Sequence, residues 1–152
     1  MATFGRLTDL VKNGLELDNS GLFFHVFSED YVKQYIILQN TRGQLFKGVD
    51  AEDVLLESIG GDYTAYTIDL KDRKNQPTDR VTLKDTGDFY KSFSVDVDAS
   101  SFTIEANYIK GGQDLRDRWG DSLAGLTDDS KTLLAKFVLP EIRKFVLNWL
   151  LK

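Results

Sequence analysis

Apolar and polar residues alternate over two neighbouring stretches close to residue 100. Phe93, Val95 and Val97 are separated by single polar residues. After a turn at residues 99–101, the same alternation returns at the apolar positions Phe102, Ile104 and Ala106. Because successive side chains of a strand point to opposite faces, one face of each stretch is apolar and the other is polar. The pattern predicts an antiparallel β-hairpin over residues 92–106.

Two segments in the first third of the chain repeat apolar residues every three or four positions, which is the spacing of an amphipathic helix. The first segment begins after Thr3, a residue suited to cap a helix, and ends near Gly14. The second begins after Ser28, where two acidic residues favour a helix N-terminus, and ends at Gly48. The expected stripe of this second, internal helix consists of Val32, Tyr35, Ile36, Gln39, Gly43 and Phe46.

The longest helical pattern lies at the C-terminus. Thr127 is its expected N-cap, and two acidic residues follow. The apolar stripe consists of Leu133, Leu134, Phe137, Val138, Ile142, Phe145, Val146, Trp149 and Leu150. Pro140 has no amide hydrogen to donate to the carbonyl of Lys136, so we expect the helix to bend there. Each large side chain contributes roughly 1.5 to 3 kcal/mol when fully buried. We therefore expect the sheet, a neighbouring subunit or both to cover the stripe.

The segments between these elements are less regular. Residues 21–27 are nearly all apolar, which fits either a linker packed on the core or a short strand. For residues 49–67 we expect a loop with a brief helical turn at 52–57 and β-favouring side chains at its end. Residues 72–80 are polar and include a proline, which indicates an exposed loop.

The motif VTLKDTGDFYKSFSVDV, residues 81–97, leads from this loop into the hairpin. Thr86 is expected to cap a single helical turn at residues 88–90. Gly87 supplies the conformational freedom that a sharp turn requires. The motif therefore predicts a structural corner at Thr86 and Gly87.

Together these patterns predict an α+β fold. We expect a small antiparallel sheet, formed by the hairpin, to pack against the internal helix and a long, kinked C-terminal helix. Residues 1–27 are expected to form an N-terminal helix or arm, and residues 28–152 a single α+β domain. A chain of 152 residues with 41% hydrophobic residues is long enough for one such domain.

Composition narrows the functional classes. The net charge is −5, so a phosphate backbone would repel the chain as a whole. The sequence contains no cysteine, which excludes disulfides, thiolate metal sites and cysteine nucleophiles. The N-terminal residues are too charged for a signal peptide, and no window has the length of a membrane span. These features predict a soluble protein without membrane contact that is not secreted by the usual route.

The sequence offers little catalytic chemistry. The single histidine, His25, lies in an apolar run, where a histidine is usually a packed core or boundary residue. Asp96, Asp98 and Ser100 begin like a calcium loop, but the turn glycine and the closing glutamate are absent. The paired carboxylates at residues 52–53 and 128–129 fit helix N-termini, and the glycine pairs at residues 60–61 and 111–112 fit turns. We therefore expect no catalytic residue, no metal site and no cofactor.

One locally basic cluster consists of Lys71, Arg73, Lys74 and Arg80. A solvated loop accounts for such a cluster, and so does contact with an acidic partner or with passing DNA. Both interpretations stay open at this point.

Four short motifs occur in a fixed order along the chain. They are QLFKGVD at residues 44–50, YTAYTIDLK at 63–71, VTLKDTGDFYKSFSVDV at 81–97 and WGDSLAGLT at 119–127. In this order they resemble a family of virion proteins of tailed phages from gut Bacteroidetes, including the crAss-like group. More distantly, the chain resembles the tail-completion and virion-morphogenesis proteins of long-tailed phages. The resemblance covers residues 34–151.

This resemblance implies a neck, connector or tail-ring subunit that is assembled in the host cytoplasm and located in the virion. Such a protein would bind copies of itself in a ring and would dock on portal or tail proteins. Genomic DNA would pass through the ring without specific binding. Aromatic residues outside regular elements are the candidates for its interfaces: Tyr63, Tyr66, Phe89, Tyr90, Tyr108 and Trp119.

Two alternatives to a structural subunit remain. One is a hydrolase of the phage particle that uses acids such as Glu105 or Asp114, although no motif supports it. The other is an assembly adaptor that is absent from the mature particle. The expected function remains that of a structural subunit without a catalytic step.

Overall fold

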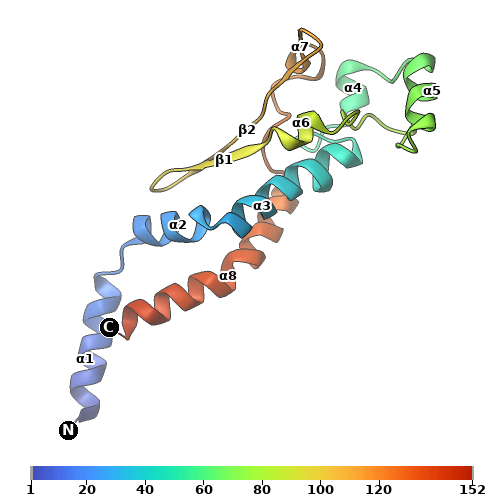
Figure 1. Ribbon diagram of the computed structural model, residues 1–152. Coiled ribbons are helices and arrows are strands. Elements are labelled where there is room, and N and C mark those ends of the chain that lie inside the picture. The colour runs from blue at the N-terminus through green and yellow to red at the C-terminus, as the bar shows by residue number, and fades with distance from the viewer. Residues whose placement is uncertain (1, 152) are drawn as a thin grey trace.

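The computed structural model describes the backbone of residues 2–151 and the side chains of residues 8–151 (Figure 1). The predicted α+β fold is confirmed: in the described residues, helices precede and follow a run of short strands. In order they are α1 (Ala2–Leu15), α2 (Asn19–Ser28), α3 (Asp30–Leu38), the π-helix η1 (Gln39–Gln44), the 3-10 helix η2 (Leu45–Lys47), α4 (Leu56–Gly60), α5 (Ala65–Arg73), α6 (Asp88–Lys91), β1 (Ser94–Val97), β2 (Phe102–Glu105), β3 (Ile109–Lys110), β4 (Gln113–Asp114), α7 (Leu115–Trp119) and α8 (Asp128–Leu150).

The predicted hairpin is confirmed. Strands β1 and β2 pair antiparallel, with Val95 opposite Ile104 and Asp96 opposite Thr103. Val95 is buried and Asp96 is exposed, so the alternation along β1 separates a core face from a solvent face. A second, very short hairpin of β3 and β4 turns at the glycine pair of residues 111–112.

The apolar side chains form two clusters that meet at the hairpin. The first, which we call the upper core, lies among α4, α6, α7 and η2 and includes Leu45, Leu56 and Trp119. The second, the lower core, joins α2, α3, β1 and α8 through residues such as Ile36 and Val138. Partly buried side chains of α3 and β2 pack against both clusters. The hairpin therefore packs on the internal helix and the C-terminal helix, as predicted.

The internal helix ends where the sequence predicts but begins differently. Gly48 ends it in the left-handed conformation, with φ of +86°. Ser28 is the last residue of α2 and does not cap α3, because Glu29 occupies the N-cap position. The stripe predicted beyond residue 38 is wrong: the wider turn of η1 rotates the following side chains, so that Asn40 and Gln44 are buried there.

These two buried amides hold the loop that precedes α8. Asn40 Nδ2 donates to the carbonyl of Leu123 at 3.0 Å, and its Oδ1 accepts from the amide of Gly125 at 2.8 Å. Gln44 Nε2 donates to the carbonyl of Gly125 at 3.0 Å, and its Oε1 accepts from the amide of Thr127 at 3.0 Å. One π-helical turn thus satisfies four backbone groups and fixes the start of α8.

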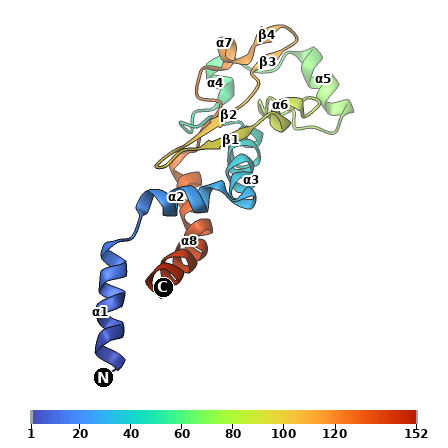
Figure 2. The same cartoon turned by 60° about the vertical axis from the view of Figure 1, so that its left-hand side comes forward.

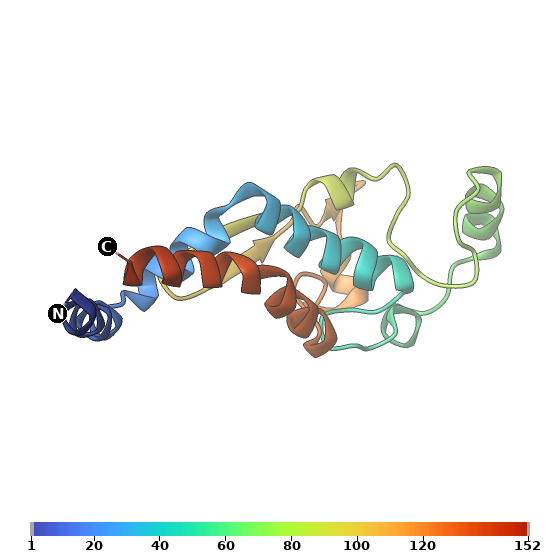
Figure 3. The same ribbon diagram turned by 90° about the horizontal axis from the view of Figure 1, so that it is seen from below.

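Helix α8 begins as predicted and is only partly covered by its own chain. Thr127 Oγ1 accepts from the amide of Ser130 at 3.2 Å, which is the expected cap. Pro140 lies inside the helix, and Figure 3 shows the helix axis bending along its length. Leu134 and Val138 of the predicted stripe are buried, whereas other large residues of the helix, including Leu133, Phe137 and Leu147, are exposed.

Residues 21–27 form most of α2, so both interpretations of this segment, a packed linker and a short strand, are wrong. Asp18 caps the helix by accepting from the amide of Ser20 at 3.0 Å. Val26 then contributes a fully buried side chain to the lower core. Because residues 21–27 are nearly all apolar, the sequence shows no helical period that would separate a buried side from an exposed side.

The segment at residues 49–67 also differs from its prediction. Its helical turn is α4, which begins at Leu56, rather than at residues 52–57. The β-favouring residues at its end do not form a strand. Thr64 is the N-cap of α5, since its Oγ1 accepts from the amide of Thr67 at 3.3 Å, and Tyr66 and Thr67 lie in the first turn of that helix. The exposed loop predicted at residues 72–80 follows once α5 ends at Arg73.

The C-terminal end of helix α1 contacts the end of α8, and the rest of α1 points away from the body (Figures 1 and 2). Asn13 Nδ2 donates to the carbonyl of Leu150 at 3.1 Å, and Trp149 Nε1 donates to the carbonyl of Asn13 at 2.8 Å. The expected cap, Thr3, lies outside the residues whose side chains are described. The domain boundary expected after residue 27 falls within α2. Among the described helices, none is long and apolar enough to span a membrane.

Candidate functional site

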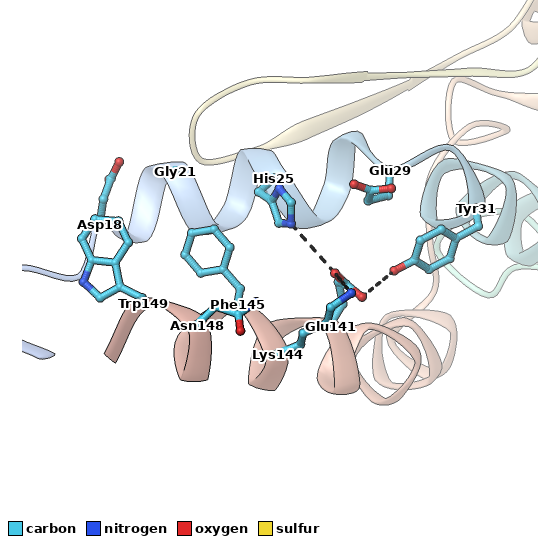
Figure 4. A pocket seen from close by; sticks show the side chains of 10 residues that line it. All are labelled: Asp18, Gly21, His25, Glu29, Tyr31, Glu141, Lys144, Phe145, Asn148 and Trp149. Atoms are coloured by element: carbon cyan, nitrogen blue, oxygen red, sulfur yellow. Dashed lines mark hydrogen bonds and ion pairs between the residues drawn. The ribbon is translucent and has the colours of Figure 1, made fainter. Parts of the chain in front are cut away.

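A groove of about 750 Å³ runs between α2 and α8. Figure 4 shows His25 of α2 and Tyr31 of α3 directed toward Glu141 of α8. His25 Nε2 lies 3.9 Å from Glu141 Oε1, and the Tyr31 hydroxyl donates to Glu141 Oε2 at 3.2 Å. Helix packing thus brings Glu141 to two polar side chains that lie more than a hundred residues earlier in the sequence.

The wall of this groove on α8 is aromatic. Phe145 and Trp149 stack with ring centroids 6.3 Å apart, and the His25 ring lies 5.1 Å from that of Phe145. His25 is therefore a boundary residue, half exposed at the side chain, as the sequence predicts. An apolar wall with a polar rim is the usual composition of a surface that binds another macromolecule.

The three polar groups favour recognition over catalysis. At 3.9 Å the His25–Glu141 contact is too long for a hydrogen bond and serves as an ion pair when His25 is protonated. Partial burial, and next the hydrogen bond to Glu141, raise the pKa of Tyr31. Tyr31 therefore keeps its proton at neutral pH and acts as a hydrogen-bond donor rather than a base.

A second site, which we call the basic pocket, has a volume of about 300 Å³ and lies among α5, β3, α7 and residues 83–85. Its lining residues include five cationic residues and one acidic residue, Asp85. The cations are Lys71, Lys74, Lys84, Lys110 and Arg118. The fold therefore concentrates positive charge at one place in an acidic chain.

The basic cluster predicted from the sequence divides between this pocket and the surface. Lys71 and Lys74 line the pocket. Arg73 pairs with Asp69 at 2.7 Å, and Arg80 donates to the carbonyl of Phe46 at 2.8 Å. The other three cations come from residues 84, 110 and 118, and no local sequence signal connects them with α5.

Lys71 is 6% exposed, and its neighbours are polar but uncharged. Its ammonium donates to the carbonyl of Lys84 at 2.6 Å and to Gln76 Oε1 at 3.2 Å. It also lies 4.7 Å from the centre of the Tyr63 ring, which favours a cation. These contacts fix the ammonium in place without neutralising its charge.

Asp85 bridges two other lysines at the mouth of the pocket. One carboxylate oxygen pairs with Lys74, and the other lies 3.2 Å from Lys110 Nζ. The hydrogen bond from Lys74 is the main reason why the pKa of Asp85 is lowered. The carboxylate therefore stays ionised at neutral pH and offsets part of the surrounding positive charge.

Two of the six aromatic interface candidates belong to the core of the chain. Phe89 and Trp119 are only 8% and 4% exposed and lie in the upper core. A Cβ atom on Gly60 would lie 2.3 Å from the Trp119 ring, so the absence of a side chain at Gly60 leaves room for the indole. These two residues cannot contact a partner in this conformation, because their own chain covers them.

The four tyrosines differ among themselves. Tyr66 is 72% exposed on α5 and is free to contact a partner. Tyr108 is partly buried beside the upper core. The Tyr63 hydroxyl accepts from the amides of Thr82 and Leu83, and burial raises the pKa of Tyr90, whose hydroxyl donates to the carbonyl of Thr82. Tyr63 and Tyr90 therefore hold the backbone of residues 82–83.

The corner before the hairpin has the predicted geometry. Gly87 has φ of +92°, which few residues other than glycine adopt. Thr86 Oγ1 accepts from the amide of Asp88 at 3.3 Å, and α6 follows as a single turn. The chain thereby turns from the wall of the basic pocket into β1.

The two acids considered for hydrolysis, Glu105 and Asp114, do not lie together in a site: Asp114 has a structural role, and Glu105 is exposed on the hairpin. Asp114 caps α7 by accepting from the amide of Arg116 at 2.9 Å, and it pairs with that residue's guanidinium at 2.6 Å. That guanidinium, through its hydrogen bonds, lowers the pKa of Asp114. Glu105 lies exposed on β2. In residues 8–151, no group of three or more histidine or acidic side chains is arranged to hold a metal ion.

Comparison with known proteins gives no relative: no family model, no curated protein and no solved structure matches the chain. Inference about function therefore depends on the surfaces described above and on the four sequence motifs. The α2–α8 groove and the basic pocket are both hollows in which polar groups from different elements converge.

Proposed function

We propose that the protein is a structural subunit of a bacteriophage virion, located in the neck or tail, that acts by assembly. In this role it binds copies of itself in a ring and docks on neighbouring portal or tail proteins. The proposal includes no catalytic step. It rests on the order of the four motifs and, above all, on the amount of surface that a single copy leaves exposed.

The exposed surface of one copy is 9712 Å². A compact monomer of 17.2 kDa would expose about 7,800 Å², so this chain exposes roughly 1,900 Å² more. A standard interface buries about 800 Å² on each partner, and a ring subunit has two such faces. The excess is therefore close to the area that the two neighbours of a ring subunit would cover.

Large apolar side chains contribute to this exposed surface at the end where α1 meets α8. Leu15 is 85% exposed and Leu151 is 61% exposed. Val11 of α1 and Leu147 of α8 are also more than half exposed. Apolar residues that gather at one end of a molecule favour a contact with another chain, because burial removes them from water.

The shape and charge also suit this role. Helix α1 projects beyond the two cores, and its contact with the body is at its C-terminal end (Figures 1 and 2). A projecting helix is available to a neighbouring subunit. The net charge of −5 suits a ring whose lumen must let DNA pass without holding it.

Two measurements test the proposal. Light scattering and negative-stain imaging of the purified protein should give a closed assembly of many copies. Mass spectrometry of virions from the phage whose genome encodes the chain should detect it in stoichiometric amount. A persistent monomer with turnover of cell-wall substrate would favour the hydrolase instead, and absence from mature particles would favour the assembly adaptor.

A further inference from the structure

The basic pocket carries more positive charge than its own chain neutralises. Asp85 is the single carboxylate of its lining and pairs with two of the five cations. Within the described residues, Lys71, Lys84 and Arg118 have no carboxylate within ion-pair distance. Their nearest partners are backbone carbonyls, neutral side chains and aromatic rings: the Lys84 ammonium lies over the Phe46 ring at 5.6 Å, and Arg118 Nε donates to the carbonyl of Gly60 at 2.8 Å.

The walls of the pocket are held in place. Leu83 has φ of +54°, a conformation that is strained for a branched side chain. The Tyr63 hydroxyl accepts from its amide at 3.2 Å, and the Lys71 ammonium donates to the next carbonyl, that of Lys84. These contacts keep the strained residue in position. The backbone of this wall and the Lys71 ammonium are therefore preorganised.

The β1–β2 hairpin carries the opposite charge. Asp96 and Asp98 are exposed near its tip, and Glu105 is exposed on β2. In the described part of the chain, none of these three carboxylates pairs with a cation. No lysine or arginine lies in residues 92–109. The hairpin therefore presents an unneutralised acidic surface around a short, structured tip.

The hairpin tip cannot reach the pocket of its own chain. The tip points away from α5, and the two lie on opposite sides of the upper part of the molecule (Figures 1 and 2). The tip is part of a paired hairpin whose apolar face packs on α3 and α8, so it is not free to fold back. Contact between these complementary surfaces therefore requires two molecules.

We propose that the acidic hairpin tip of one copy docks in the basic pocket of the next, as a self-association contact of this chain. The inference rests on the proposed function, because it specifies one contact of the ring. Asp96 and Asp98 of the tip face Lys84, Lys110 and Arg118 of the pocket. Each copy uses its hairpin tip to contact one neighbour and its basic pocket to contact the other. The contact is therefore head-to-tail and continues from copy to copy into a ring or a filament.

Charge complementarity of this kind sets orientation and association rate. Opposite charges steer two molecules toward one relative orientation, and repulsion between like charges disfavours other orientations. Because the cations at the mouth are solvent-exposed, salt screens them over about 8 Å at physiological ionic strength. The association is therefore expected to weaken as salt increases.

The test is a reciprocal charge exchange in the full chain. The first variant combines Lys84→Glu with Lys110→Glu, the second combines Asp96→Lys with Asp98→Lys, and the third carries all four changes. The dissociation constant between subunits is measured by analytical ultracentrifugation. Each one-sided variant should weaken self-association by roughly tenfold or more, and the four-fold variant should recover most of the loss.

Matched controls separate the contact from net charge and from folding. Lys33→Glu with Lys136→Glu changes the net charge as the first variant does, on helices away from the pocket, and should leave self-association unchanged. Thermal unfolding monitors the fold. If Lys84→Glu with Lys110→Glu lowers stability, the milder pair Lys84→Gln with Lys110→Gln replaces it, with a smaller expected loss.

The outcomes distinguish this contact from the proposed function. Assembly that is unaffected by both one-sided variants, or not restored by the four-fold variant, overturns the hairpin–pocket contact and leaves the virion proposal standing. A chain that is monomeric at every concentration overturns both. Fluorescence anisotropy with duplex DNA is the remaining comparison: DNA binding that is lost on Lys84→Gln with Lys110→Gln while self-association is unchanged would assign the pocket to phosphate and overturn the contact.

Discussion

The hydroxyl of Tyr63 accepts a hydrogen bond from the backbone amide of Leu83 at 3.2 Å, and Leu83 has φ of +54°. The same hydroxyl accepts from the amide of Thr82 at 2.9 Å. A side chain that begins before α5 thus holds a strained residue twenty positions later. This one oxygen atom, together with the contacts of Tyr90 and Lys71, holds the wall of the basic pocket.

Tyr63→Phe is therefore expected to lower the free energy of unfolding by about 1 to 3 kcal/mol, because two amides beside the core lose their acceptor. Urea denaturation measures the change. Tyr66→Phe is the matched control, since this tyrosine is 72% exposed, and should change stability by less than about 0.5 kcal/mol. Equal effects of the two substitutions would contradict the role given to Tyr63.

Asn40 is fully buried, and its amide satisfies both the carbonyl of Leu123 and the amide of Gly125. Asn40→Ala leaves these two backbone groups without a partner and should lower the unfolding free energy by about 2 to 3 kcal/mol. Gln34→Ala, at an exposed position of α3, serves as the control and should be close to neutral. Differential scanning calorimetry compares the two. A stable Asn40→Ala protein would show that the loop is held by other contacts.

How far the sequence predicts this fold can be judged from two residues. Thr127 caps α8 as expected, because an N-cap is a local arrangement of neighbouring residues. Nothing in the sequence marks Asn40, because its importance depends on the π-helical turn that directs it toward a loop more than eighty residues away. Local sequence patterns predict the hairpin and α8. They do not predict η1 and its buried amides, which depend on contacts between distant residues.

The same distinction applies to the candidate sites. Lys71 and Lys74 could be recognised as part of a basic cluster because they are neighbours in sequence. Lys110 and Arg118 join them only through the folding of β3 and α7, for which the sequence showed nothing beyond a glycine turn. Phe89 and Trp119 were expected at an interface, but an aromatic residue in a short element packs equally well inward, and here both do.

Gly87 offers a test of backbone conformation that is free of steric conflict. Its φ is +92°, and the nearest atom to an added Cβ would be Lys91 Cε at 3.9 Å. Gly87→Val should lower stability by about 1 to 3 kcal/mol, because a β-branched residue is strained at positive φ. Gly87→Asn should cost less, because asparagine adopts positive φ more readily. Thermal unfolding of both variants checks the order, and an equally stable valine variant would refute it.

Asp85 gives a prediction about pH. Its pKa in the folded protein lies below the ordinary value of 3.8, chiefly because Lys74 donates to it. A lowered folded-state pKa adds stability above the unfolded-state pKa, and this stability is lost as the pH falls through the folded-state value. Asp85→Asn should therefore reduce stability near neutral pH, by about 0.5 kcal/mol because the pair is solvent-exposed.

The difference between the wild type and Asp85→Asn should narrow as the pH falls from about 5 to below about 3. Chemical denaturation over this range measures it. A difference that stays constant with pH would mean that the Asp85 carboxylate, although paired in the structure, adds nothing through its charge.

The apolar end of the molecule is expected to matter for assembly and not for folding. Leu15→Ser with Leu147→Ser should reduce the assembled fraction in light scattering while the melting temperature stays nearly constant, because both side chains are mostly exposed. Leu134→Ala is the contrasting change: this residue is 5% exposed, and its loss should cost about 2 to 5 kcal/mol of stability. Unchanged assembly in the double variant would place the apolar contact elsewhere.

The hydrogen bond between Trp149 and Asn13 also affects the order of folding during translation. The two residues are 136 positions apart, so α1 is synthesised long before the turn of α8 on which it rests. Until that turn has been synthesised, the contact surface of α1 is exposed on the nascent chain.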